Sequence, residues 1–325
     1  MEIFQAWRTE RGYPPAIGSS GWFTYERRFV EWAEAAGHRF DMAISTDLET
    51  PGALDGYDLV ICVGHDEYWS WDMRKTVEEW VEKGGHFSRF GGNFLWQIRL
   101  EDDGARQVCW KTKAPQYDPV RDDPEKKHLL TASWESGGVS WPGASTVGVN
   151  GCHGMYGSWG GFAPRGSRGF TVYRPEHWAF EGTDLRYADV FGAEAGIFGY
   201  EVDGLNYTFE RGLPYPVADP GVPEGIEILA MSPAVLFEYE REGPGYRYYV
   251  RDSDLVGLAE LSAEDYPVAR RNYQYGSGMV VSMNRGKGEV FTAGSCEWIM
   301  GLTRRDPFTE TITRNALERF SGAAD

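Results

Sequence analysis

Cysteine and long apolar runs are scarce in this sequence, and their scarcity argues against several classes of protein. The chain has 325 residues and four cysteines, none of them in a CxxC pair. This spacing suggests neither a disulfide framework nor a thiolate zinc site. No stretch approaches the roughly 20 apolar residues of a membrane span, and the first residues lack the basic, apolar and small-residue order of a signal peptide. We therefore expect a cytoplasmic protein without a membrane partner.

Basic residues are also outnumbered by acidic ones. Lys and Arg number 32 against 49 Asp and Glu, which gives a formal net charge of -17 and a pI near 4.8. Proteins that bind nucleic acid need clustered positive charge for its phosphates, so we expect no nucleic-acid partner. The composition, with 42% hydrophobic and 25% charged residues, is that of a folded globular protein. The sequence leaves two kinds of partner: a small-molecule substrate, and further copies of this chain in a homo-oligomer.

Hydrophobic periodicity predicts an α/β fold with a doubly wound, mostly parallel sheet of the flavodoxin-like type. Apolar residues recur at helical spacing in three segments, and each of these segments is followed by a glycine that suits a helix C-terminus. Ser70 is placed to cap the second helix. Short apolar runs between the helices are typical of strands. The pattern predicts helices over 25–36, 71–83 and about 312–321, and strands over 38–45, 59–63, 86–93 and 288–295.

Composition divides the chain into three parts. Residues 1–104 carry the first helices and strands of the α/β domain, and residues 276–325 carry its final strand and helix. Between them, residues 105–275 are rich in Gly, Trp, Tyr and Pro and contain only short apolar runs. This composition predicts a large β-rich, loop-rich insertion. We expect the insertion to pack over the carboxyl edge of the sheet.

The strand predicted over 59–63 runs directly into Gly64, His65, Asp66 and Glu67. In open α/β sheets, ligands bind outside the carboxyl ends of the strands, where the N-termini of helices also point. A hydrolase with a covalent intermediate would carry Ser or Cys in such a turn, and this turn has neither. A mechanism in which a carboxylate or a metal ion activates water is therefore favoured.

Three side chains near the strand ends are candidates for this chemistry. His65 and Glu67 are two residues apart in an extended turn, so both can point the same way. Asp66 is explained well by the positive end of the helix that follows. Asn93 comes after Gly91-Gly92, whose lack of side chains would let a ligand approach the backbone. Its amide could hold a substrate carbonyl or an oxyanion, or it could only serve the turn.

Four separated stretches carry a resemblance to a known family: FVEWAEAAGHRFDMAISTDLE, GHDEYWSWDMRKTVEEWVEKGGHFSRFGGNFLW, HWAFEGTDLRYADVFGAEAGIFGYEVDG and GKGEVFTAGSCEWIMGL. In this order they are similar to the C-terminal catalytic region of the N,N-dimethylformamidase large (beta) subunit. The resemblance spans nearly the whole chain. It implies a class I glutamine-amidotransferase-like fold and an amide hydrolase activity.

The resemblance also implies which residues carry the chemistry. The glutamate of the family's H-x-E-Y motif falls on Glu67 and its histidine on His65. The asparagine of the GGN motif falls on Asn93, and the glutamate of the G-Y-E motif matches Glu201. In this interpretation His65 or Glu201 handles protons, while Asn93 steadies the substrate oxygen.

A mononuclear iron, held by two tyrosine phenolates and one glutamate, is the cofactor that the resemblance implies. Glu67 matches the glutamate ligand, and Tyr25 corresponds to one of the tyrosines. Ferric iron is a hard Lewis acid that favours such oxygen ligands. The other tyrosine falls on Trp7, in the run Ala6-Trp7-Arg8, and an indole cannot replace a phenolate.

Two hypotheses for the function follow from the sequence. The first is a hydrolase that cleaves the C–N amide bond of a small, formamide-like molecule by metal- or carboxylate-activated water. The alternative is a non-catalytic binding protein for a saccharide or peptide, built on the same sheet, that has lost the metal. Trp7 favours the alternative, whereas the retained His65, Glu67 and Asn93 favour the enzyme.

Overall fold

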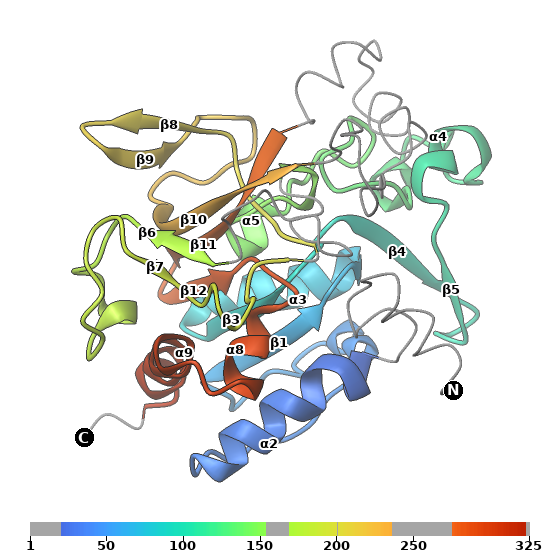
Figure 1. Cartoon of the computed structure of the whole chain (residues 1–325). Helices are drawn as coiled ribbons and strands as arrows, with labels where there is room; N and C mark the ends of the chain where they lie inside the picture. The colour runs from blue at the N-terminus through green and yellow to red at the C-terminus, as the bar shows by residue number, and fades with distance from the viewer. Residues whose placement is uncertain (1–20, 154–168, 200, 236–274, 323–325) are drawn as a thin grey trace, which may run out of the picture.

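A seven-stranded mixed sheet forms the centre of the molecule (Figure 1). The computed structural model describes residues 21–153, 169–199, 201–235 and 275–322. The strand order of the main sheet is β1-β3-β12-β11-β10-β6-β7, and two small sheets have the orders β2-β4-β5 and β8-β9. The strands are β1 (Leu59–His65), β2 (Tyr68–Ser70), β3 (His86–Gly92), β4 (Trp96–Glu101), β5 (Arg106–Val108), β6 (Phe170–Val172), β7 (Val190–Phe191), β8 (Tyr207–Glu210), β9 (Leu213–Pro216), β10 (Glu227–Val235), β11 (Tyr275–Arg285) and β12 (Gly288–Ala293).

The sheet is parallel on one side and antiparallel on the other. β1, β3 and β12 pair in parallel, as the sequence pattern predicts for these segments. The four remaining pairings, from β12 to β7, are antiparallel. The expected mostly parallel pairing thus covers three strands only, because a two-residue turn joins β11 to β12 and a turn this short permits only antiparallel strands. The flavodoxin-like and glutamine-amidotransferase-like class stays a prediction.

Helices cover both faces of the sheet. α3 (Trp71–Lys83) packs on one face, where it joins a core with the inward side chains of β3, β11 and β12. On the other face α2 (Arg27–Ala35), α8 (Trp298–Thr303) and α9 (Pro307–Phe320) pack together (Figure 1). No helix in the described ranges is long and apolar enough to cross a membrane. The shorter helical segments are η1 (Trp22–Glu26), η2 (Ser45–Glu49), η3 (Lys111–Lys113), α4 (Ala114–Tyr117), η4 (Lys127–Leu129), α5 (Ala144–Val147), η5 (Gly151–His153) and η7 (Trp178–Phe180).

The three predicted helices are confirmed. Ser70 caps α3 as expected, because its hydroxyl accepts a hydrogen bond from the N–H of Met73 at 3.1 Å. The predicted strand over 38–45 is wrong: residues 38–44 form no strand, and Ser45 begins η2. Met42 and Ile44, which alternate as in a strand, are exposed. Among the described strands β1 is the outermost on this side, and residues 38–44 do not pair with its free edge, so their alternating side chains have no sheet face on which to pack.

The residues predicted to form an insertion contribute strands to the main sheet. β6, β7 and β10 all lie within 105–275, and β10 pairs with β11 along its length. This region therefore widens the sheet, in addition to supplying the loops and the β8–β9 hairpin beyond it (Figure 1). The domain boundaries at 104/105 and 275/276 stay a prediction.

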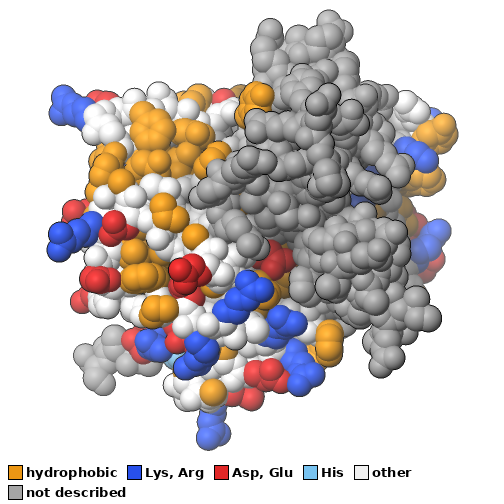
Figure 2. Space-filling model, viewed as in Figure 1, with side chains coloured by type: hydrophobic (Ala, Val, Ile, Leu, Met, Phe, Trp, Pro, Cys, Tyr) orange, Lys and Arg blue, Asp and Glu red, His pale blue; other side chains and the backbone are white. Residues whose placement is uncertain are grey.

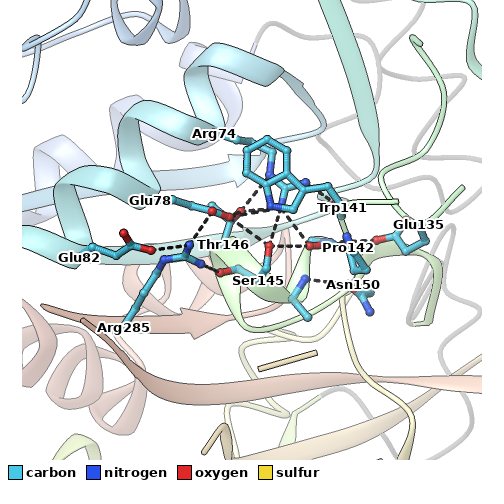
Figure 3. Close-up of polar contacts among 12 residues, drawn as sticks. Arg74, Glu78, Glu82, Glu135, Trp141, Pro142, Ser145, Thr146, Asn150 and Arg285 are labelled. Carbon is cyan, nitrogen blue, oxygen red and sulfur yellow. Dashed lines mark hydrogen bonds and ion pairs between the residues drawn. The ribbon is translucent and has the colours of Figure 1, made fainter. Parts of the chain in front are cut away.

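A buried arginine ties α3 to the loop that precedes α5 (Figure 3). The Arg74 guanidinium lies over the rings of Trp134 and Trp141, 4.2 and 4.1 Å from their centroids. It donates hydrogen bonds to Thr146 Oγ1 and to the carbonyl oxygens of Trp141 and Pro142. Burial lowers its pKa to about 9, which still leaves it charged at neutral pH. Because Arg74 belongs to the first turn of α3, this cluster fixes the helix that follows the β1 turn.

Glu135 lies at the margin of this cluster (Figure 3). Its Oε1 accepts a hydrogen bond from the N–H of Gly143 at 3.3 Å, and its buried Oε2 has no hydrogen-bond partner in the described part of the chain. Burial raises the pKa of this carboxyl to about 7. A carboxyl in this setting costs free energy whenever it ionises.

Glu135→Gln is expected to weaken the dependence of stability on pH. The unfolded chain loses this proton near its ordinary pKa of about 4.3, whereas the folded chain keeps it until about pH 7. The folded state therefore binds more protons in this window, and the free energy of unfolding falls as the pH rises through it. The loss is on the order of 2–3 kcal/mol. Urea unfolding at intervals between about pH 5 and about pH 8 measures it; equal slopes for wild type and variant would contradict the prediction.

Candidate active site at the carboxyl ends of strands β1 and β3

Glycines bring three segments together at the ends of β1 and β3. Gly64 has a φ of +83°, and a Cβ at this position would lie 2.3 Å from the ring of Tyr25. A Cβ on Gly91 would lie 2.4 Å from the carbonyl oxygen of Gly64, and one on Gly92 would lie 2.4 Å from that of Glu201. No larger residue permits such approaches. The ring of Tyr25 and the backbone of Glu201 thus reach the strand ends.

His65 is the centre of the resulting site. Its Nε2 lies 2.8 Å from Glu201 Oε2, 3.4 Å from Glu67 Oε2 and 3.4 Å from Asn93 Nδ2. The four catalytic residues named from the sequence therefore meet around one imidazole nitrogen, although Glu201 lies 134 positions beyond Glu67 in the numbering. The expectation that His65 and Glu67 point the same way is confirmed.

The Glu67 carboxylate is held between the side chains of Lys111 and His65. Lys111 Nζ lies 3.0 Å from Oε1, and the imidazole of His65 faces Oε2. A site residue at a strand end would face an open cleft, but the Glu67 side chain is only 8% exposed, against 25% for His65 and 42% for Lys111. The carboxylate is therefore mostly covered, and the more exposed groups beside it are His65 and Lys111. Lys111 also lies 4.9 Å from the ring centroid of Tyr68.

The charge of His65 depends on its acidic neighbours. Burial by itself would lower the pKa of this imidazole, but Glu201, Glu67 and Asp66 more than offset the burial, so the pKa lies above its usual range. The group is thus protonated over a wider pH range than a free histidine, which suits a residue that passes protons between a carboxylate and a substrate.

Asp66 points away from the other site residues. Its Oδ1 accepts a hydrogen bond from Trp69 Nε1 at 2.7 Å, and its Oδ2 pairs with Arg89 Nε at 3.1 Å. The sequence explained Asp66 by the positive end of α3. The structure adds a fully buried arginine as its partner, so Asp66 anchors the turn that presents His65 and Glu67.

Tyr25, the tyrosine assigned to the metal, is buried beside acidic groups. Its hydroxyl makes no hydrogen bond with any residue that the structure describes. Burial raises the pKa of this phenol far above its usual range, and Cys296, Glu297 and Glu201 raise it further through their negative charge. A buried hydroxyl without a partner, next to carboxylates, is a setting that a cation would stabilise, and phenolate with carboxylate is a donor set that ferric iron favours. Tyr25 fits a metal ion in this respect, and the carboxylates that act on it are those of Glu297, Glu201 and Glu26.

Histidine, cysteine and carboxylate side chains do not by themselves complete a metal site here. Within the described ranges, no group of three or more of them could hold a metal ion. A set that includes tyrosines is a different case, and the position that corresponds to the second tyrosine, Trp7, lies outside the described residues.

Two residues at the site were not found from the sequence. Lys111 has no local signal, because only the fold brings η3 beside Glu67. Asp203 is buried, and it accepts hydrogen bonds from the N–H groups of Asn93 and Phe94 at 2.6 and 3.1 Å. Its spacing of two from Glu201 repeats the spacing of His65 and Glu67, and this was a signal that the sequence offered.

Comparison with known proteins identifies the family of this chain. A family profile described as N,N-dimethylformamidase beta subunit-like, C-terminal, matches residues 4–312. The N,N-dimethylformamidase beta subunit of an Alcaligenes species is 22% identical over 318 residues, which cover 90% of this chain and 36% of that protein. The chain thus spans about a third of the length of this relative. All the residues assigned to the site, from Tyr25 to Glu201, lie within the matched region, and the chain belongs to the N,N-dimethylformamidase beta subunit-like C-terminal family.

Proposed function

We propose that this protein hydrolyses the C–N amide bond of a small, formamide-like molecule. The observation that carries the proposal is the meeting of Glu201, Glu67 and Asn93 around His65 Nε2. Family membership supports an amidohydrolase of this type. The turn that follows β1 offers no hydroxyl or thiol nucleophile, so water is the attacking group.

The residues around His65 divide the work between them. Asn93 Nδ2 donates a hydrogen bond to the carbonyl oxygen of the amide and stabilises the negative charge that develops there. The His65–Glu201 pair, 2.8 Å apart, accepts a proton from the attacking water and returns it to the leaving nitrogen. Of the four side chains, that of His65 is the most exposed, at 25%, whereas those of Glu67 and Glu201 are 8% and 7% exposed and Asn93 is buried. The substrate therefore enters beside His65.

Glu67 fixes the position of His65 and is the residue that would hold a metal ion together with Tyr25. A bound ferric ion would supply Lewis acidity toward the amide carbonyl and toward water. The ammonium group of Lys111 lies 3.0 Å from one oxygen of the buried Glu67 carboxylate and so offsets part of its negative charge. The hydrolase is expected to be cytoplasmic, with a small molecule as its partner.

The test is an amide-hydrolysis assay with the purified wild type and Lys111→Met. Formamide, N-methylformamide and N,N-dimethylformamide serve as substrates, and released formate and amine are quantified together with bound iron. We expect turnover by the wild type and a loss of about 10–100-fold in kcat/KM for Lys111→Met, because the variant leaves Glu67 without its ammonium partner. No release of formate from any of these amides by iron-supplemented wild type would reject the proposal.

One observation favours the alternative, a saccharide-binding protein. Hydrophobic side chains gather on the face that carries the β8–β9 hairpin (Figure 2), and Tyr207, Phe209 and Tyr215 are exposed there. Exposed aromatic rings with polar edges can stack on sugars. Thermal melts with added iron or added saccharides separate the two functions: stabilisation by iron supports the hydrolase, and stabilisation by saccharides alone supports the binding protein.

A further inference from the structure

A buried ionic network lies directly beneath the His65 site. The Asp203 carboxylate, fully buried, accepts hydrogen bonds from the N–H of Asn93 (2.6 Å), the N–H of Phe94 (3.1 Å) and Arg89 Nη1 (2.7 Å). Arg89 is also fully buried, and its Nε donates to Asp66 Oδ2 at 3.1 Å. One guanidinium therefore joins two carboxylates from distant segments.

Each member of the network is close in sequence to a residue of the site. Asp66 lies between His65 and Glu67, and Asp203 is two residues beyond Glu201. Arg89 is on β3, the strand that ends just before Asn93. The three segments that supply the site are therefore also linked by these buried ion pairs and hydrogen bonds, in addition to the contacts around His65.

Stability alone is a weak explanation for this network. Burying a guanidinium and a carboxylate removes both from water, and replacing such a pair by apolar residues is often neutral or stabilising. The network instead holds a particular backbone conformation: Asn93 has a φ of +66°, in the left-handed region, which asparagine adopts more readily than most residues but at some cost in free energy. Asp203 binds the N–H groups of Asn93 and Phe94, the two amides that this conformation directs inward.

We propose that Asp203, through Arg89 and Asp66, is a positioning residue that sets the Asn93 amide against His65 and Glu201. Asp203 does not touch the substrate. It holds the ends of β1 and β3 in register with the segment that carries Glu201, and in this way it supports the proposed amide hydrolysis. The inference rests on that function.

Asp203→Asn tests the proposal, with Glu78→Gln as the matched control. Glu78 is a buried carboxylate that pairs with Arg285 at 2.6 Å and belongs to the cluster in Figure 3, away from His65. For N,N-dimethylformamide hydrolysis we expect Asp203→Asn to lower kcat by about 30–100-fold with little change in KM, since small misplacements of catalytic groups have effects of this size. Glu78→Gln should keep kcat within about twofold, even if the two variants lose similar stability. An equal loss of kcat in both would overturn the proposal.

A readout that needs no activity is amide hydrogen exchange followed by mass spectrometry. In Asp203→Asn, peptides that cover 64–70, 91–97 and 201–205 should lose protection together, and in Glu78→Gln they should not. Faster exchange confined to 91–97 would show a local turn contact and contradict the network. If the wild type hydrolyses no amide, the proposed function fails, while the exchange result still decides the positioning role. Asp66→Asn, at the partly exposed end of the network, serves if Asp203→Asn does not fold, and it should expose the same three peptides.

Discussion

Replacing Glu67 by glutamine should abolish amide hydrolysis, with a fall in kcat/KM of at least about 10³-fold. Glutamine keeps the size and one hydrogen-bond acceptor of the side chain but removes its negative charge. In the wild type that charge faces Lys111 Nζ at 3.0 Å and His65 Nε2 at 3.4 Å. The variant therefore loses the negative charge that holds Lys111 and His65 in place, and with it the carboxylate assigned to a metal ion. Initial rates of formate release from N,N-dimethylformamide measure the effect.

The structure offers a matched control for this variant. Glu289 is equally buried, pairs with Arg319 at 3.0 Å, and lies at the amino end of β12, which is the opposite end of the sheet from His65. Glu289→Gln should therefore leave the rate within about twofold, although it also neutralises a buried, paired carboxylate. Iron content adds a second readout, because only Glu67→Gln should lower the bound iron. Hydrolysis by Glu67→Gln within tenfold of the wild-type rate, or unchanged iron, would contradict the role given to Glu67.

Gly64→Ala should destabilise the fold by roughly 2–5 kcal/mol. Two costs add: the backbone at φ +83° disfavours a Cβ by about 1–2 kcal/mol, and the new methyl would overlap the ring of Tyr25, whose nearest atom is 2.3 Å from the ideal Cβ position. Tyr25 is buried and has no room to withdraw without disturbing the core on that face of the sheet. Urea unfolding measures the loss, and the midpoint of thermal unfolding should fall by about 3–7 °C.

Gly56→Ala separates the two costs. Gly56 has a similar φ of +87°, but nothing lies within 4 Å of a Cβ at that position. Its replacement should therefore cost only the backbone part, about 1–2 kcal/mol. Removing the ring first should have the same result: in a Tyr25→Ala background, Gly64→Ala should cost no more than Gly56→Ala does in the wild type. Equal losses for Gly64→Ala and Gly56→Ala in the wild type would show that the Tyr25 ring does not need the space at Gly64.

Local sequence patterns predicted the parallel part of the fold well. The run from Leu59 into the turn at Gly64, the Ser70 cap and the helix stops are all decided by residues a few positions apart, so they can be identified without the fold. The prediction was wrong at 38–45, where Met42 and Ile44 alternate as in a strand but the segment does not pair with the edge of β1, the outermost described strand on that side. Alternation of apolar and polar residues is a property of one segment, whereas a β-strand also needs a neighbouring strand with which it forms hydrogen bonds.

The antiparallel half of the sheet was harder to anticipate. β6, β7 and β10 are separated from the parallel strands by long stretches of sequence, and β6 and β7 are only three and two residues long. Strands this short carry too few residues for a period of two to be recognised. β10 takes its place by pairing with β11, β6 by pairing with β10, and β7 by pairing with β6.

The sequence by itself determined which residue types stand at the strand ends: His65 and Glu67 after β1, and Asn93 after β3. It also carried the motifs by which Glu201 was named. Only the tertiary structure decided that these four side chains meet around one imidazole nitrogen, that Lys111 neutralises Glu67, and that Asp203 holds Asn93 through its backbone. The reason is physical. Periodicity, caps and turns arise from neighbours along the chain, whereas ion pairs in a buried site arise between segments that only the folded sheet places within hydrogen-bonding distance.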